Sequence, residues 1–153
     1  MVAIERIGHA VLRVWDVEKS VVFYCGVLGM ELVQRDQEHN RAFLSFGVQH
    51  HDLGLFPAKG DTPQSDRGLG HLALRIEGGD EELAAWHQKL LESGVEIGNV
   101  TDHGMTHSVY FKDPDGNGLE IYCDVQGTAE DGKRFMQERG GTATKPLDLA
   151  PVA

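Results

Sequence analysis

The chain has 153 residues, a formal net charge of −10 and two cysteines, Cys25 and Cys123. This length suffices for a domain with a substantial core. Two cysteines are too few for a disulfide framework, so we expect two buried thiols and a cytoplasmic protein. The acidic balance excludes nucleic-acid binding, which requires clustered basic residues. The sequence begins without a basic start followed by an apolar run, and no stretch approaches the ~20 apolar residues of a membrane span, so we expect neither export nor a membrane partner.

The segment IGHAVLRV at residues 7–14 returns as LGHLALRI at residues 69–76. His9 and His71 are therefore equivalent positions, 62 residues apart (71 minus 9). Apolar and polar residues alternate in both copies, which predicts strands with one aliphatic face and one face that carries histidine and arginine. A pair repeated at a fixed offset indicates two copies of one structural unit.

Each predicted strand is followed by a helix and then by three more strands. The first helix begins after Asp16 as N-cap and ends near Gly29, and the second covers GDEELAAWHQKLLESG and ends at Gly94. The strand segments are MELVQRD, RAFLSFG and HDLGLFP in the first half, and GVEIGNV, HSVYFKD and GLEIYCD in the second. The fold class is therefore α+β, with a β-α-β-β-β module at about residues 4–57 and again at about 69–124.

Residues 58–68 are rich in proline and glycine and form the predicted linker between the modules. Each module is too small to close its own sheet. We therefore expect the two to share a curved, half-open mixed β-barrel within a single domain of residues 1–124, with both helices on the outer face and the two repeated histidines on the concave face. Residues 125–153 are polar and form a tail or arm, with one short helix predicted over Thr128–Arg139.

The last predicted strand supplies an acidic partner for the two histidines. In GLEIYCD, Leu119 and Ile121 form the aliphatic face, so Glu120 points to the opposite one. A carboxylate on the concave face is costly unless it is paired or bound to a cation. Together with the two histidines it forms a two-histidine, one-carboxylate set, which leaves open coordination positions and is typical of non-haem Fe(II) oxygenases.

With these residues and the segment YFKDPDGNGLEIY, the chain resembles the vicinal oxygen chelate superfamily over residues 4–124. This superfamily includes glyoxalases, bleomycin resistance proteins and extradiol ring-cleaving dioxygenases. The resemblance implies that His9, His71 and Glu120 are metal ligands. In the glyoxalase I branch a fourth ligand, usually a glutamate, comes from the last strand of the first module, where HDLGLF contains no glutamate.

Two further segments resemble extradiol dioxygenases. QHHDLGLF resembles the segment that carries their acid–base histidine, which implies His51, whereas strand alternation favours His50; both stay open, with His51 preferred. DHGMTHSVYFKDPDGNGLE implies that His103 supports the site and that Tyr110 donates a hydrogen bond to substrate. The interval between these two residues is shorter than in full-length ring-cleaving enzymes, and many of those enzymes contain four modules, whereas this chain contains two.

The resemblance thus implies an Fe(II) extradiol dioxygenase that cleaves a small aromatic diol with O2 and forms a homodimer, with Mn, Zn or Ni as alternative metals. One alternative is a metal-dependent isomerase or transferase of the glyoxalase or fosfomycin-resistance kind. Another is a metal-free drug-binding protein, which the complete ligand set disfavours. We assign no chemistry to His39, Trp86 or His87, and His107 is either a surface residue or a contact at the rim of the site.

Overall fold

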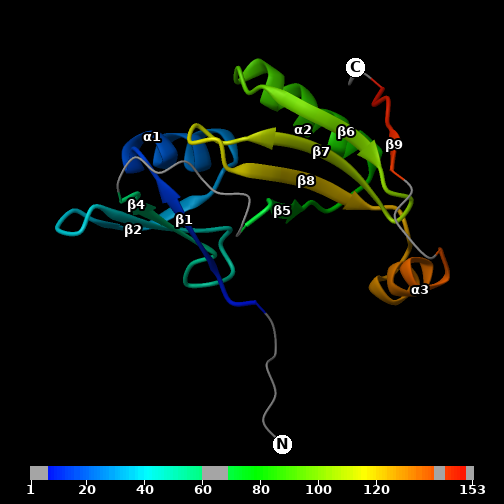
Figure 1. Cartoon of the computed structure of the whole chain (residues 1–153), viewed down its shortest axis with the longest axis horizontal. Coiled ribbons are helices and arrows are strands. Elements are labelled where there is room, and N and C mark those ends of the chain that lie inside the picture. Colours follow the sequence, from blue (N-terminus) through cyan, green and yellow to red (C-terminus); the bar gives the residue numbers. More distant parts are fainter. Residues whose placement is uncertain (1–6, 60–68, 140–143, 151–153) are drawn as a thin grey trace, which may run out of the picture. The chain divides into compact units, whose positions relative to one another are not determined.

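The computed structural model describes residues 7–59, 69–139 and 144–150. The chain divides into two compact units, residues 1–64 and 65–153, and the division falls within the predicted linker. Most of that linker, residues 60–68, lies outside the described residues, as do residues 4–6 of the predicted first module. Each unit contains its own sheet (Figure 1). The α+β class is confirmed, and the joining of the two sheets into one half-open barrel stays a prediction.

The first unit is a four-stranded sheet with one helical segment. Its elements are β1 (Ala10–Val14), α1 (Val17–Val21), the π-helical turn η1 (Val22–Val27), β2 (Glu31–Asp36), β3 (Arg41–Ser45) and β4 (Leu53–Pro57). The strand order is β1-β4-β3-β2, with β1 parallel to β4 and the other pairs antiparallel. Asp16 caps α1 as predicted, because its Oδ1 accepts a hydrogen bond from the Lys19 N–H at 3.1 Å.

The second unit repeats this topology. Its elements are β5 (Leu72–Arg75), α2 (Asp80–Glu92), β6 (Ile97–Asp102), β7 (Thr106–Lys112), β8 (Gly118–Asp124), α3 (Ala129–Arg139) and β9 (Lys145–Pro146). The order is β5-β8-β7-β6-β9, again with a parallel pair, β5 and β8. Gly94 follows α2 at a φ of +72°, a conformation that favours glycine at a helix end. The predicted β-α-β-β-β repeat is therefore confirmed in both units.

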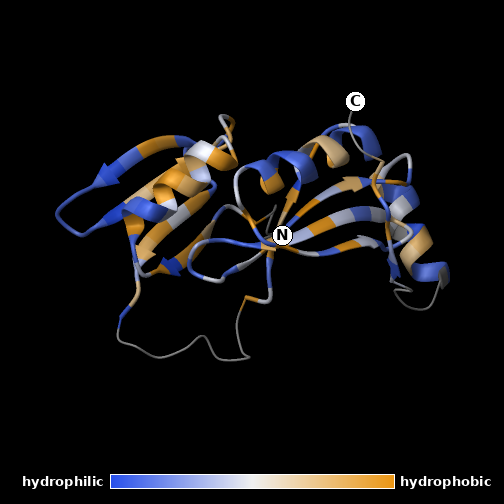
Figure 2. Cartoon of the chain, turned by 90° about the horizontal axis from the view of Figure 1, so that it is seen from above, coloured by the Kyte–Doolittle hydropathy of each residue, from blue (hydrophilic) through white to orange (hydrophobic). Residues whose placement is uncertain are grey.

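The predicted alternation decides which face of each sheet is buried. On β1, Leu12 and Val14 are buried while Val11 and Arg13 are exposed, and on β8 Leu119 and Ile121 are buried. In the second unit α2 covers this apolar face and contacts β7 and β8 (Figure 1). Hydrophobic (orange) and hydrophilic (blue) residues both occur along the strands in Figure 2. His9 and His71 directly precede β1 and β5, and the same alternation assigns them to the opposite face of each sheet. Among the described residues, no helix is long and apolar enough to cross a membrane.

The DPDGNG turn connects β7 to β8 through a buried hydrogen-bond cluster. Asp113 Oδ1 accepts hydrogen bonds from the backbone N–H groups of Asp115, at 2.9 Å, and Asn117, at 2.8 Å. Gly116 adopts a φ of +83°, which an L side chain rarely tolerates. The turn therefore holds one strand register, in which Tyr110 lies directly opposite Glu120.

The C-terminal segment adds one predicted and one unpredicted element. The predicted helix is α3, and the Thr128 hydroxyl accepts a hydrogen bond from the Asp131 N–H at 3.1 Å near its start. β9 was not predicted; it pairs antiparallel with the edge strand β6 at Thr101 and Asp102. Proline is tolerated on such an edge because its missing N–H removes no bond from the sheet interior. Residues 140–143 and 151–153 of the tail lie outside the described part.

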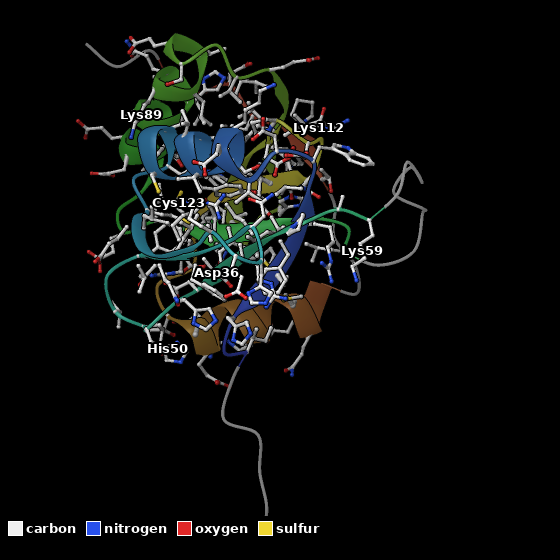
Figure 3. The ribbon with its side chains drawn as sticks, turned by 90° about the vertical axis from the view of Figure 1, so that its left-hand side faces the viewer. Asp36, His50, Lys59, Lys89, Lys112 and Cys123 are labelled. Carbon is white, nitrogen blue, oxygen red and sulfur yellow. The ribbon has the colours of Figure 1, made fainter. Side chains whose placement is uncertain are left out.

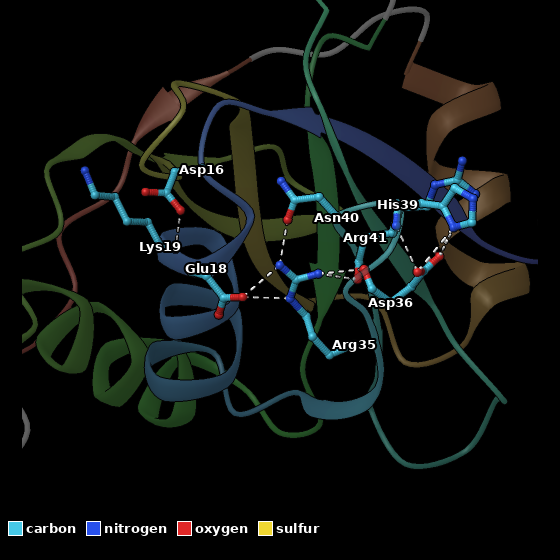
Figure 4. Close-up of polar contacts among 8 residues, drawn as sticks. All are labelled: Asp16, Glu18, Lys19, Arg35, Asp36, His39, Asn40 and Arg41. Atoms are coloured by element: carbon cyan, nitrogen blue, oxygen red, sulfur yellow. Dashed lines mark hydrogen bonds and ion pairs between the residues drawn. The ribbon is translucent and has the colours of Figure 1, made fainter.

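Arg35 joins α1 to the β2–β3 hairpin in the first unit (Figure 4). Its Nε donates to Glu18 Oε1 at 2.8 Å, and its Nη2 donates to Asn40 Oδ1 at 2.6 Å. Its Nη1 donates to the Arg41 carbonyl at 3.0 Å. In the same hairpin His39 lies 3.0 Å from the Asp36 carboxylate, which gives this histidine a structural role. The cluster fixes the helix against one end of the sheet.

Candidate metal and catalytic site

His71 and Glu120 come together on neighbouring strands of the second unit. His71 directly precedes β5, and Glu120 lies on β8 opposite Ala73 of β5. His71 Nε2 lies 3.0 Å from Glu120 Oε2. Gly118 permits this approach, because a Cβ at that position would lie 2.8 Å from the Gly70 carbonyl oxygen and 3.3 Å from the His71 Cβ. The close strand contact thus depends on a glycine.

The His71–Glu120 pair fits two adjacent coordination positions of a divalent metal. Two donors that each lie about 2.1 Å from one ion, at right angles, are about 3.0 Å apart. Glu120 is only 7% exposed, so a cation would offset the cost of burying its charge. No group of three metal-binding His, Cys, Asp or Glu side chains forms among the residues that the structure covers. The second unit thus supplies two of the three predicted donors, and the third, His9, belongs to the first unit.

Tyr110 lies between the metal-binding pair and His103. It faces Glu120 across β7 and β8, and its Oη is 2.9 Å from His103 Nε2. The His71 ring meets the Tyr110 ring edge-on, with centroids 5.6 Å apart. Burial first, and then the negative charge of Glu120, raise the pKa of Tyr110 to about 12. The phenol therefore keeps its proton at neutral pH and can act as a hydrogen-bond donor.

A cavity of about 320 Å³ opens beside His71 and Tyr110. Its walls also include Glu96, Asn99 and Lys112, three polar residues that the sequence did not single out. Its volume falls in the range of small-molecule sites. The sequence signal that could have found Lys112 is its position two residues after Tyr110, which places both side chains on one face of β7.

In the first unit, His51 lies next to His9. Their ring centroids are 4.4 Å apart, and Phe43 packs edge-on against His51 at 5.3 Å. His50 is exposed in the loop before β4 (Figure 3), with its Nδ1 2.6 Å from His51 Nδ1. β4 begins only at Leu53, so strand alternation does not decide between the two histidines. The structure places His51 beside the predicted ligand, and its acid–base role stays a prediction.

The surroundings of His51 favour its neutral form. Burial is the largest cause that lowers its pKa, followed by the positive charges of His9 and His50, while Asp52 acts in the opposite direction. A neutral imidazole can accept a proton at neutral pH. This is the state that a general base requires.

The other residues considered from the sequence do not line the cavity. His107 pairs with Asp80 at the start of α2, with Nδ1 and Oδ1 2.5 Å apart, and does not line the cavity. Trp86 lies under the Lys89 ammonium at 4.4 Å on α2. Both cysteines are free thiols; Cys123 is buried, but Cys25 is only half-buried, which corrects the expectation for that residue.

The chain is a paired-module protein with two β-α-β-β-β units. Each unit has a histidine directly before its first strand, and the second has a glutamate on its last strand. These are residue types that bind metals. The sequence matches the Glyoxalase/Bleomycin resistance protein/Dioxygenase superfamily over residues 6–121. The chain belongs to this family. The resemblance predicted from its motifs is confirmed.

Relatives within the family differ in activity. Biphenyl-2,3-diol 1,2-dioxygenase 3 of Rhodococcus globerulus is 30% identical over 98% of this chain and 83% of its own length. A probable lactoylglutathione lyase of Vibrio parahaemolyticus is 33% identical over 81% of this chain and 94% of its own. The fold matches the structure of a fosfomycin resistance protein, FosX, of Listeria monocytogenes complexed with Mn(II) and sulfate. The TM-score is 0.67 and the identity 24%, over 87% of this chain and 99% of that one. Similarity alone therefore does not determine which activity the chain has.

Proposed function

We propose that the protein is an Fe(II)-dependent extradiol-type dioxygenase that opens the ring of a catechol-like diol with O2. The observation that carries the proposal is the contact of Tyr110 with His103 directly beside the His71–Glu120 pair. A phenol that stays protonated beside a two-donor metal pair suits the binding of a diol oxygen. The similarity to a biphenyl-diol dioxygenase supports the same reaction.

We assign His9 as the third metal ligand, because it occupies in the first unit the position that His71 occupies in the second. Bound Fe(II) would supply the redox chemistry with O2 and lower the pKa of a substrate hydroxyl. His51 would take the hydroxyl proton on Nε2, since its Nδ1 faces His50. This residue stands beside His9, where the metal would lie if His9 is a ligand.

The direction of the hydrogen bond between His103 and Tyr110 depends on the tautomer of His103. If His103 carries its proton on Nε2, it donates to Tyr110 Oη; the phenol proton, which Glu120 can accept here, would bind a substrate oxygen once a metal holds the carboxylate. Tyr110 then holds one diol oxygen in place through its O–H. The hydrogen-bonded pair would orient the ring while His51 handles the proton.

The second candidate is a glyoxalase-like isomerase, favoured by the similarity to lactoylglutathione lyases. The last strand of the first unit disfavours it, because β4 has the sequence LGLFP and supplies no carboxylate. At Gly54 there is little space for a larger side chain, since a Cβ would lie 3.1 Å from the Phe56 ring. Within the described residues, β4 thus offers no fourth donor of the kind that branch uses.

Anaerobic loading with Fe(II), followed by air and catechol, tests the proposal. A yellow ring-opened product should form, with one O2 consumed per catechol. Isomerisation of a glutathione hemithioacetal without oxygen uptake would instead assign the chain to the second candidate. Gel filtration of the loaded protein would test the predicted homodimer.

A further inference from the structure

We infer that the diol substrate of the proposed dioxygenase carries a short side chain with both an ammonium and a carboxylate group, bound by Glu96 and Lys112. The inference rests on the proposed function and specifies its substrate class. It is carried by the cavity in the second unit, where these two opposite charges share the wall with His71 and Tyr110.

Glu96 and Lys112 lie across from each other on adjacent strands. Ile97 of β6 pairs with Phe111 of β7, so the residue before the first and the residue after the second are neighbours in this antiparallel register. Both point away from the face of the buried Phe111. Lys112, at the end of β7, is labelled in Figure 3.

Glu96 and Lys112 are both exposed side chains. In the part of the chain that the structure describes, neither Glu96 nor Lys112 forms an ion pair, although they face each other. On the same sheet Arg75 and Asp124 do form an ion pair, with Arg75 Nε 2.6 Å from Asp124 Oδ2. An unpaired cation and an unpaired anion on one cavity wall complement a ligand that has both signs.

The spacing places the charged side chain of the substrate at the far end of the ring from its diol. Tyr110 and Lys112 are two residues apart on one strand face, which corresponds to about 7 Å. A benzene ring with a side chain of two or three carbons spans such an interval. Three glycines, Gly70, Gly98 and Gly118, also line the cavity, and at Gly98 even a methyl group would lie 3.3 Å from the Tyr110 carbonyl oxygen.

A substrate with a single charged group would place it near a residue of the same sign, and an uncharged substrate would pair with neither Glu96 nor Lys112. A ring that bears only a carboxylate would bring it next to Glu96, and a ring that bears only an ammonium would bring it next to Lys112. An uncharged ring would use neither residue. The α-amino and α-carboxyl groups of an amino acid match both residues at once.

Four compounds that share one diol ring test the inference: 4-methylcatechol, dopamine, 3-(3,4-dihydroxyphenyl)propionate and 3,4-dihydroxyphenylalanine. With Fe(II)-loaded protein, kcat/KM for dihydroxyphenylalanine should exceed the other three values by about 10-fold or more. Ring opening of all four at equal kcat/KM would overturn the inference and leave the proposed dioxygenase intact. Anaerobic calorimetric titration of the loaded protein measures the same preference without turnover, so equal affinities would overturn the inference even if no ring is opened.

Single variants separate the two contacts. Lys112→Met should lower kcat/KM about 10-fold more for the two carboxylate-bearing compounds than for the two without a carboxylate. Glu96→Gln should do the same for the two ammonium-bearing compounds. Lys89→Met on α2, outside the cavity, is the matched control and should leave all four values unchanged. A uniform effect of Lys112→Met on the four compounds would show that the side chain has only a structural role.

Discussion

Tyr110 and Glu120 face each other directly across β7 and β8, ten residues apart in the sequence (120 minus 110). The register is held by the turn in which Asp113 accepts backbone hydrogen bonds from Asp115 and Asn117. One residue more or less in this turn would shift the register and bring Tyr110 opposite a residue of the buried face. The turn therefore sets the geometry of the candidate site from outside it.

Loss of any proposed ligand should remove the metal. His71→Ala or Glu120→Ala leaves one donor of the pair alone, and His9→Ala tests the ligand assigned from the first unit. Each should weaken metal binding by more than about 100-fold, because these groups would bond the ion directly. The metal-to-protein ratio after Fe(II) loading and desalting measures this. His87→Ala on α2 is the control, and full metal content in His71→Ala would contradict the assignment.

Tyr110→Phe should retain metal and lose turnover by roughly 10²-fold, because only a hydrogen-bond donor is removed. In the metal-free protein, a near-ultraviolet absorbance titration should show one tyrosine fewer ionising at about pH 12 in the variant. Since the folded pKa lies above the ordinary value near 10, wild-type stability should fall as pH rises from about 10 to 12. The variant should lack this contribution; identical titrations would refute the assigned environment.

His51→Phe and His50→Phe distinguish the two histidines. The first should reduce kcat by roughly 10²-fold with metal retained, because it removes the proposed general base. The second should be much milder, since His50 is exposed and does not contact His9 in the way that His51 does. If His50→Phe is instead the severe variant, the acid–base role belongs to His50.

Gly118→Ala should impair both stability and metal binding. The new Cβ would meet the Gly70 carbonyl at 2.8 Å, a backbone atom that can move only with the start of β5 and with His71. We expect a loss of about 1–3 kcal/mol in the free energy of unfolding, measured in urea. Gly132→Ala on α3 is the matched control, because a Cβ there has no neighbour within 4 Å and alanine favours a helix.

Arg35→Ala should destabilise the first unit by about 1–3 kcal/mol. It removes the donors to Glu18, Asn40 and a backbone carbonyl from a side chain that is only 14% exposed. Urea unfolding measures the change. Arg134→Ala on α3 removes an exposed pair with Asp131 and should cost much less than Arg35→Ala. Equal losses in the two variants would mean that Arg35 does not anchor α1.

Local patterns were enough to predict most of the fold and part of the site. The repeated Gly-His line predicted two equivalent units, since a period of two along a strand follows from backbone geometry alone. The same period placed Glu120 on the polar face of β8, and the compact DPDGNG turn carried the alternation into the next strand with Tyr110 on the same face. These features depend on neighbours in the sequence, so they can be read from it.

Contacts between distant segments were decided only by the tertiary structure. His51 lies beside His9, a contact that alternation could not predict because the chain before Leu53 is not a strand. β9 exists because the edge of β6 offers unpaired backbone groups, a condition that its own short sequence does not contain. The position of Glu96 beside Lys112 on a cavity wall likewise depends on the register between two strands, which backbone hydrogen bonds set across the sheet.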